Sequence, residues 1–232
     1  VDHHRRIVAA IRPLGEPCVR AGPWCPVSGR GPPATGYHRS VATSGTASPR
    51  ISLVIPARNE ERFLPRLLDS VDVAREHYPG GPAAIEVIVA DNASTDHTAD
   101  VARESGCIVV RVEERRIATV RNAGAAAARG ELVAFVDADA SIHPDTFGSI
   151  ERAIASGRWI AGATGVRLER WSPGIASAYL MLYPWIVLLR MDTGVVFCRR
   201  CDFEAIGGYD ERRLFGEDVQ LLWDLRRLGR RR

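Results

Sequence analysis

Residues 51–60 read ISLVIPARNE, and this stretch decides the fold. It opens with a short apolar run that is rich in β-branched side chains, which predicts a buried strand ending at Pro56. The polar residues that follow lead into a helix predicted over 60–78, because apolar residues recur on one helical face from Phe63 to Ala74. A buried strand, a polar turn and an amphipathic helix are the repeating unit of an α/β fold.

The same unit is repeated along the chain, with apolar runs that predict strands and periodic or alanine-rich stretches that predict helices. These elements are, in order, a strand over 85–90, a helix over 95–105, a strand over 107–112, a helix over 117–129, a strand over 132–136, a helix over 145–155, strands over 159–168 and 194–198, and a helix over 217–228. The early strands are apolar almost throughout, which is typical of parallel strands buried on both faces. We therefore predict a Rossmann-like α/β domain with a mostly parallel central sheet and helices on both faces.

The N-terminal residues differ from the rest of the chain. Glycine, proline, serine and threonine dominate from Gly15 to Pro49, which predicts a disordered N-terminal extension over 1–49. The apolar run near the N-terminus is too short for a signal peptide. We therefore expect one folded domain over 50–232.

Charge and cysteine content exclude some classes of function. A formal net charge of +3 over 232 residues gives no reason to expect a nucleic-acid partner. Among the five cysteines, Cys198 and Cys201 form one CRRC, but no second pair completes a zinc site. We expect reduced thiols and a cytoplasmic protein.

Polar clusters follow three of the predicted strands. They are Pro56–Glu60, Asp91-Asn92 and Asp137–Asp139. Ligands of open α/β sheets bind outside the carboxyl ends of the strands, so these clusters are expected to meet at one crevice.

Asp137 and Asp139 are two carboxylates separated by one residue at the end of a buried strand. Such a pair can hold a divalent ion and a ribose hydroxyl, and Mg²⁺ or Mn²⁺ is often held by one or two carboxylates together with substrate phosphates. The ion neutralises a diphosphate and makes it a better leaving group. A solvated turn is the alternative for an isolated Asp-X-Asp, and the strand context and the other clusters argue against it.

Four segments together resemble the family 2 glycosyltransferases, which have the GT-A fold. They are ISLVIPARNEE (51–61), IEVIVADNASTDHTADVA (85–102), RIATVRNAGAAAARGELVAFVDADA (116–140) and FEAIGGYDERRLFGEDVQLLWDLRRLG (203–229). The resemblance implies a GT-A catalytic domain over 50–232 that moves a sugar from a UDP- or GDP-sugar, with Mn²⁺ or Mg²⁺, to a hydroxyl acceptor. The acceptor classes left open are a lipid carrier, a polysaccharide and a small molecule, with cell-envelope biosynthesis as the expected setting.

The resemblance also implies roles on the donor side. The residues expected to line the nucleotide-sugar pocket are Pro56, Ala57, Arg58, Glu60, Asp91, Arg116, Asp137 and Ala138. Asp91 is expected to accept a hydrogen bond from the nucleobase of the donor. Arg116 is expected to approach the nucleotide, with Arg115 as the alternative. Asp139 is the expected metal ligand, and Asp137 is expected to face the ribose and share the metal.

On the other side of the reaction, Asp218 resembles the catalytic base of inverting members, and Glu217 either shares this role or binds the acceptor. An inverting transfer needs a carboxylate that takes the proton of the acceptor hydroxyl. The start of a predicted helix favours an ionised carboxylate at this position. Gly208 and Tyr209 resemble the family loop beside the acceptor, and Asp192 is expected to reach the donor sugar or the acceptor; a structural role is the alternative for all three.

Several polar residues carry two interpretations each. Arg121 and Asn122 either orient the loop beneath the diphosphate or serve packing. The four residues after the second strand that are expected to cap a helix are Asn92, Ser94, Thr95 and Asp96. His143 either approaches the metal or lies in an exposed loop. No histidine follows it, so the metal is expected to rest on Asp139, the diphosphate and water.

Residues 171–189 carry no charge over a length close to a membrane span. A span is not expected, because Asp139 and Asp218 flank this segment and must meet in one site. Two interpretations stay open. The segment is buried on the acceptor side, or it is an interfacial helix that places the protein peripherally at the inner face of the cell membrane near a lipid-linked acceptor.

Two other functions compete with sugar transfer. A nucleotidyltransferase would favour a glycine-rich phosphate loop and a lysine near the first strand, and this chain contains no lysine. A non-catalytic nucleotide-sugar-binding relative stays open because the sequence ends shortly after Asp218. Either the acceptor site is open, or the chain is truncated.

Overall fold

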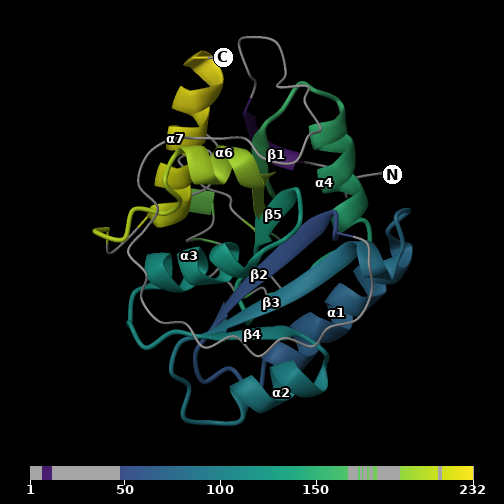
Figure 1. Cartoon of the computed structure of the whole chain (residues 1–232), viewed down its shortest axis with the longest axis vertical. Coiled ribbons are helices and arrows are strands. Elements are labelled where there is room, and N and C mark those ends of the chain that lie inside the picture. Colours follow the sequence, from purple (N-terminus) through teal and green to yellow (C-terminus); the bar gives the residue numbers. More distant parts are fainter. Residues whose placement is uncertain are drawn as a thin grey trace.

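The computed structural model describes residues 7–11, 48–166, 194–213 and 216–231, with Ser172, Gly174, Ser177, Leu180 and Met181 between them. Its strands form one seven-stranded sheet in the order β1-β6-β7-β5-β2-β3-β4. Helices lie against both faces of this sheet (Figure 1). The predicted α/β fold with helices on both faces is confirmed.

The strands of this sheet are β1 (Ile7–Ile11), β2 (Ile51–Ala57), β3 (Ile85–Asp91), β4 (Ile108–Arg111), β5 (Leu132–Phe135), β6 (Ala161–Thr164) and β7 (Val196–Arg199). The helices are α1 (Leu64–His77), the short 3-10 helix η1 (Pro82–Ala84), α2 (Thr98–Glu104), α3 (Ile117–Ala127), α4 (Thr146–Ala155), α6 (Arg200–Ala205) and α7 (Glu217–Arg231). Helix α6 is absent from the elements predicted above.

The sheet has a parallel half and an antiparallel half. Strands β5, β2, β3 and β4 run parallel to one another, as the uninterrupted apolar runs predict. Strand β7 lies antiparallel to β5 and β6, and β1 lies antiparallel to β6. All of the strand ends that carry the predicted polar clusters therefore belong to the parallel half.

Two hydrophobic cores cover the two faces. Helices α1, α2 and α4 pack on one face, and α3, α6 and α7 on the other. In β2, Leu53 and Ile55 belong to the first core, whereas Val54 between them belongs to the second. Because successive side chains of a strand point to opposite faces, β2 packs in both cores and is apolar at almost every position, with the buried Ser52 as the exception.

Strand β1 differs from the predicted disordered extension over 1–49. Its register pairs Ile11 with Ala161 of β6. Strand β6 would otherwise present unpaired backbone groups at the edge of the sheet, and the apolar sequence of residues 7–11 can cover it. Except for residues 48 and 49, the rest of the extension lies outside the described residues.

Several predicted element boundaries move by a few residues. Helix α1 begins at Leu64, because the Glu60 carbonyl accepts the N–H groups of Phe63 and Leu64 in a turn that precedes it. Helix α2 begins at Thr98, so Ser94 is not its N-cap. Strand β6 is shorter than the strand predicted over 159–168.

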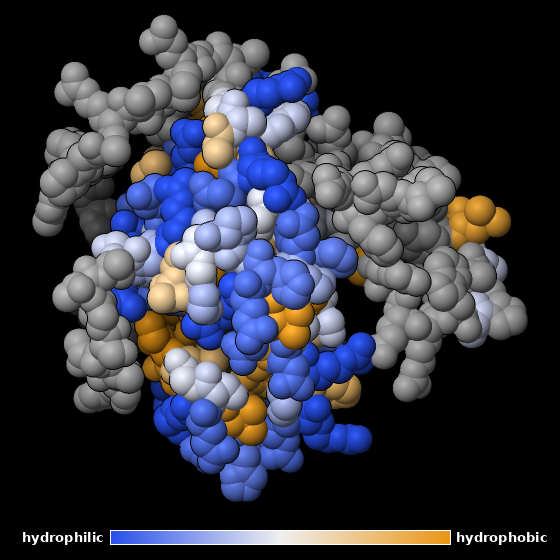
Figure 2. Space-filling model, turned by 90° about the vertical axis from the view of Figure 1, so that its right-hand side faces the viewer, coloured by the Kyte–Doolittle hydropathy of each residue, from blue (hydrophilic) through white to orange (hydrophobic). Residues whose placement is uncertain are grey.

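The uncharged segment 171–189 is described at five positions only, and all five are exposed, including the hydrophobic Leu180 and Met181. Both interpretations of this segment stay predictions. Across the described part of the chain, no helix has the length and hydrophobicity that a bilayer crossing needs. The face drawn in Figure 2 is hydrophilic over most of its described residues, with small hydrophobic patches between them.

Candidate active site

A cleft of about 500 Å³ opens where the carboxyl ends of β2, β3 and β5 meet the first turns of α3 and α7. The residues that line it are Pro56, Ala57, Arg58, Glu60, Asn92, Arg115, Ile117, Val120, Arg121, Asp137, Ala138, Asp139 and Glu217. The structure thus brings together residues from all three polar clusters, separated in sequence by up to 80 residues or so, as expected of strand ends in a parallel sheet. Eight of the predicted site residues are in this lining.

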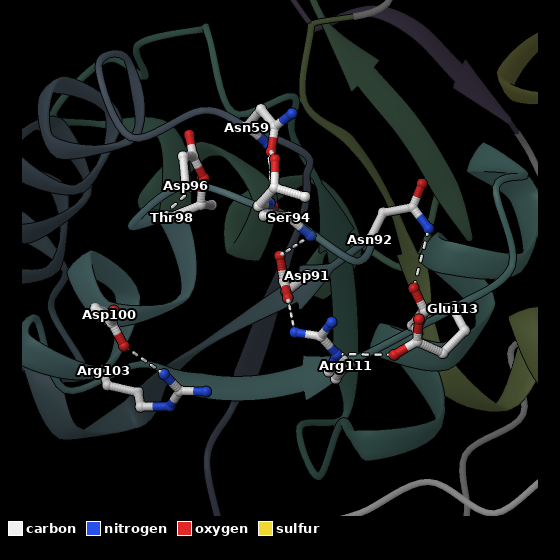
Figure 3. Close-up of polar contacts among 12 residues, drawn as sticks. Asn59, Asp91, Asn92, Ser94, Asp96, Thr98, Asp100, Arg103, Arg111 and Glu113 are labelled. Atoms are coloured by element: carbon white, nitrogen blue, oxygen red, sulfur yellow. Dashed lines mark hydrogen bonds and ion pairs between the residues drawn. The ribbon is translucent and has the colours of Figure 1, made fainter.

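The loops after β2 and β3 are fastened to each other by side-chain hydrogen bonds. The backbone N–H of Asn59 donates to Ser94 Oγ at 3.0 Å, and Asn59 Oδ1 accepts the backbone N–H of Thr95 at 2.9 Å. The N–H of Glu60 donates to Thr98 Oγ1 at 2.8 Å. Figure 3 shows Asn59 and Ser94 facing each other across the gap between the loops. The two loops therefore brace each other through Ser94 and Thr95, whereas Asp96 Oδ1 accepts the N–H of Thr98 at 3.0 Å, at the start of α2.

Asp91 lies behind the cleft wall. It is 1% exposed, its Oδ1 accepts the N–H of Ser94 at 3.2 Å, and its Oδ2 lies 3.6 Å from Arg111 Nη1 (Figure 3). Its neighbour Asn92 lines the cleft and donates from Nδ2 to the carbonyls of Val112 and Glu114. Asn92 is thus the residue of this cluster that reaches the cleft. The predicted hydrogen bond of Asp91 to the nucleobase of the donor stays a prediction.

Of two adjacent arginines, Arg115 lines the cleft and Arg116 does not. Arg116 has an extended backbone, with φ −128° and ψ 122°, and its Nη1 donates to the carbonyl of Glu211 at 3.1 Å. Consecutive side chains of extended backbone point to opposite sides, so only one of the two can face the cleft. Arg115 is therefore the arginine of this pair that lines the cleft, and the role of either one toward the nucleotide stays a prediction.

Arg121 is the centre of the charge arrangement, although the sequence left its role open. It is 4% exposed and comes from the middle of α3. Its Nη2 donates to Asp137 Oδ1 at 2.8 Å, and its Nη1 donates to Glu217 Oε1 at 2.7 Å and to Asp218 Oδ1 at 2.9 Å. One guanidinium thus links the donor-side motif, Asp137–Asp139, to Glu217 and Asp218, the pair that contains the expected catalytic base. An arginine inside an otherwise apolar, alanine-rich helix was the available signal, because a buried arginine needs carboxylate partners.

Asp218 lies in the first turn of α7 and keeps 20% of its side chain exposed. Burial raises the pKa of this carboxyl group; Arg121 and the Tyr209 hydroxyl lower it, while Glu217 and Asp137 raise it. The net pKa lies above the usual value, as is useful for a residue that takes up a proton. Glu217 lines the cleft, and Asp218 is the next residue in the chain, just behind this lining.

Tyr209 is buried next to Asp218, and its role toward an acceptor stays a prediction. It is 2% exposed, and its hydroxyl donates to Asp218 Oδ1 at 2.8 Å. Gly208 before it has φ +74°, and a Cβ there would lie 2.6 Å from Asn122 Oδ1. Both residues thus shape the support of Asp218. Asp192, the third residue expected on the acceptor side, lies outside the described residues.

The oxygen ligands expected of a magnesium or manganese site are present in the cleft. Asp137 and Asp139 line it, and Glu60 lies near enough that its pKa is raised, first by burial and then by Asp139, Asp96 and Asp137. The described residues contain no cluster of three or more acidic, histidine or cysteine side chains able to hold an ion unaided. Two carboxylates, those of Asp137 and Asp139, suit an ion whose remaining ligands are substrate phosphates. His143 is exposed, and its Nδ1 accepts the N–H of Asp145.

The sheet, with its cleft at the carboxyl ends of parallel strands, defines an enzyme domain of the GT-A glycosyltransferase fold. Residues 52–174 match the family model described as Glycosyl transferase family 2. The chain belongs to this family.

Known relatives of the family align with part of the chain. The glycosyltransferase AglE of Haloferax volcanii is 32% identical over 126 residues, which cover 52% of this chain and 38% of AglE. The chain spans well under half the length of the curated relatives it matches.

Solved structures show the same fold. The mannosyltransferase PcManGT from Pyrobaculum calidifontis, in complex with GDP-Man and Mn²⁺, superposes with a TM-score of 0.61 at 22% identity, covering 83% of this chain and 56% of that chain. TarS from S. aureus, in complex with UDP-GlcNAc, superposes with a TM-score of 0.58 at 23% identity, covering 76% of this chain and 53% of that chain.

Proposed function

We propose that this chain transfers a sugar from a UDP- or GDP-sugar to a hydroxyl acceptor, with inversion at the anomeric carbon and with Asp218 as general base. One observation carries the proposal. Arg121 hydrogen-bonds to Asp137 of the donor-side motif and to Asp218, so the two halves of the reaction share one charge cluster. An inverting transfer needs the donor phosphate and the base in this proximity.

The donor fits the charges of the cleft. Arg58 and Arg115 line it together with Asp137 and Asp139, which suits a diphosphate held between arginines and a carboxylate-bound ion. The two structural neighbours named above hold GDP-Man with Mn²⁺ and UDP-GlcNAc, which supports a sugar nucleotide as the donor class. When bound at Asp139 and Asp137, Mn²⁺ or Mg²⁺ would offset the charge of the diphosphate leaving group.

The reaction is then a single displacement. Asp218 takes the proton of the acceptor hydroxyl while the hydroxyl oxygen forms a bond to the anomeric carbon. The bond from that carbon to the diphosphate oxygen breaks, and the nucleoside diphosphate leaves from the opposite face. Glu217, which lines the cleft, is placed to orient the acceptor.

The acceptor is proposed only as a hydroxyl compound, with a lipid carrier, a polysaccharide and a small molecule as the classes to be tested. Segment 171–189 would bring the first of these to the site from the inner face of the cell membrane. Binding to anionic vesicles, compared with a variant that carries two aspartates in this segment, tests that contact.

A thermal-shift screen of UDP, GDP, dTDP and CMP, with and without Mn²⁺, tests the donor site. A nucleotide that binds the folded state raises its stability by about 2.7 kcal/mol at a hundredfold excess over Kd. We expect an Mn²⁺-dependent rise of the melting temperature with UDP or with GDP, and none with dTDP or CMP. No shift with any nucleotide would contradict the proposal, and a shift without turnover of any sugar nucleotide would favour a non-catalytic binder.

A further inference from the structure

Asp218 presents its two carboxylate oxygens differently. Oδ1 accepts the hydroxyl of Tyr209 at 2.8 Å and Nη1 of Arg121 at 2.9 Å. Within the part of the chain that the structure describes, Oδ2 accepts no hydrogen bond. A carboxylate oxygen that accepts two donors has its lone pairs engaged, so the other oxygen is the one left to take a proton.

Tyr209 is anchored through both its ring and its backbone. Its ring packs edge-on against Phe135 with 5.1 Å between centroids, and against Phe203 with 5.8 Å. Its backbone N–H donates to Asn122 Oδ1 at 2.9 Å, and its carbonyl accepts Asn122 Nδ2 at 3.0 Å. An anchored ring of this kind fixes the direction from which its O–H meets Asp218.

We propose that Tyr209 is a positioning residue, which holds Asp218 by Oδ1 so that Oδ2 is the oxygen that receives the proton of the acceptor. This inference rests on the proposed function. As the new bond between Oδ2 and hydrogen forms, the O–H bond of the acceptor breaks, and its electron pair makes the bond to the anomeric carbon. The electron pair of the donor bond leaves with the nucleoside diphosphate.

A purely structural role for Tyr209 makes a different prediction. If the hydroxyl only satisfied a buried polar group, its removal would alter stability and leave the geometry of the base unchanged. If it positions Asp218, its removal affects turnover only while Asp218 is present. The two roles therefore differ in how Tyr209 and Asp218 depend on each other.

The variant Tyr209→Phe removes the hydroxyl and keeps the ring. Tyr78→Phe is the matched control, because the Tyr78 hydroxyl also donates to a carboxylate, Glu151 Oε2 at 3.2 Å, at the opposite end of the sheet. The assay is Mn²⁺-dependent release of nucleotide from UDP-GlcNAc and from GDP-mannose, with water as the acceptor. We expect kcat to fall about tenfold in Tyr209→Phe, as for a lost hydrogen bond to a charged group, with the KM for the donor unchanged. Tyr78→Phe should keep the wild-type kcat.

The decisive comparison repeats Tyr209→Phe in an Asp218→Asn background. We expect no further loss of kcat there, because the hydroxyl no longer has a base to position. An unchanged kcat in the single variant, or the same tenfold loss in both backgrounds, would overturn the proposal. Should Tyr209→Phe fail to fold, Asn122→Ala releases the loop that carries Tyr209 and should lower kcat in the same way, again only while Asp218 is present.

A wild-type protein that releases no nucleotide from either donor and shows no Mn²⁺-dependent thermal shift with UDP or GDP would contradict the proposed function, not this inference. The carboxyl ¹³C titration of Asp218 needs no turnover and tests the contact directly. The charged groups around this carboxylate are Arg121 of α3, Glu217 of α7 and Asp137 after β5. Loss of the Tyr209 hydroxyl should move the titration to higher pH, and Tyr78→Phe should not; equal titrations in all three proteins would refute the positioning contact.

Discussion

The two ends of the central sheet are both built from carboxylates and arginines, but among the described residues the carboxylates of only one end are fully paired. At the amino ends of the strands, Glu86 accepts Ser52 Oγ at 2.5 Å, the N–H of Arg129 at 2.6 Å and Arg129 Nε at 2.9 Å. At the carboxyl ends, Arg121 is the one cation that forms ion pairs with Asp137, Glu217 and Asp218 within the described part of the chain. The first cluster has a donor for each oxygen of its carboxylate, and the second has more negative charge than its one cation offsets.

The pKa values follow the same division. Hydrogen bonds from Arg50 are the main cause that lowers the pKa of Glu151 at the amino end, although burial opposes them. Burial is the main cause that raises the pKa of Asp218 and of Glu60 at the carboxyl end. A carboxylate that the fold itself stabilises has a structural role, whereas carboxylates left with raised pKa values are typical of functional sites. Four experiments test this contrast.

The largest effect is expected from Asp218→Asn. Loss of a general base lowers kcat by about 1,000-fold, while the affinity for the nucleotide should stay near the wild-type value. Single-turnover rates and nucleotide thermal shifts measure the two quantities. Asp224→Asn on the same helix is the control, since the partners of Asp224 among the described residues are Gln220 and Arg227 of α7 itself. A normal kcat in Asp218→Asn would refute the assignment of the base.

Glu86→Ala should act on stability and not on catalysis. It leaves the Ser52 hydroxyl and the N–H of Arg129 without their acceptor, whereas the N–H of Gly130 keeps Ser52 Oγ at 2.8 Å; the expected cost is about 3 kcal/mol. Denaturant unfolding measures this loss, and Glu76→Ala at an exposed position of α1 is the control. A specific activity that falls along with stability would contradict the division between the two ends.

Lowering the pH should remove activity before it unfolds the protein. Since the folded pKa of Asp218 is raised, its carboxylate is lost at a higher pH than that of an exposed aspartate. The rate should then fall about tenfold for each pH unit below that pKa. A raised pKa in the folded state means that protonation of Asp218 does not destabilise the fold. Loss of activity only together with loss of circular dichroism would contradict this order.

The smallest effect is expected from Glu151→Gln, about 1 kcal/mol, because the pair with Arg50 is partly exposed. A folded pKa below the unfolded one contributes stability above the unfolded pKa, and this contribution is lost as the pH falls through the folded pKa. The melting temperatures of the variant and the wild type should therefore differ at neutral pH and converge in acid. A constant difference down to low pH would rule out the ion pair as its cause.

The sequence was sufficient for the parts of the fold that depend on local pattern. Apolar runs located β2, β3 and β5, and the polar residues after them located the cleft, because strand ends of a parallel sheet share one edge. Strand β1 was missed because its pairing with β6 is a long-range contact that no local pattern records. Arg116 was preferred to Arg115 because the sequence does not state on which side of an extended backbone each side chain lies.

The inner support of the site was harder to predict than its lining. Arg121 and Tyr209 lie about 90 residues apart in sequence and meet only through packing, with the guanidinium carbon 5.4 Å from the ring centroid. Nothing in the sequence spacing of Arg121 or Tyr209 indicates that the two residues are in contact. Their polar groups could be recognised as a support for Asp218 only once α3 and α7 were placed against the same face of the sheet.

The interlocked loops after β2 and β3 have a consequence for protein engineering. Asn59 is hydrogen-bonded to Ser94 and Thr95, and Glu60 to Thr98. The conformation of each loop therefore depends on hydrogen bonds to the other loop. Grafting residues 57–61 from another glycosyltransferase without residues 91–98 would separate each donor from its acceptor. A library that aims to change the donor should therefore exchange both loops as one cassette.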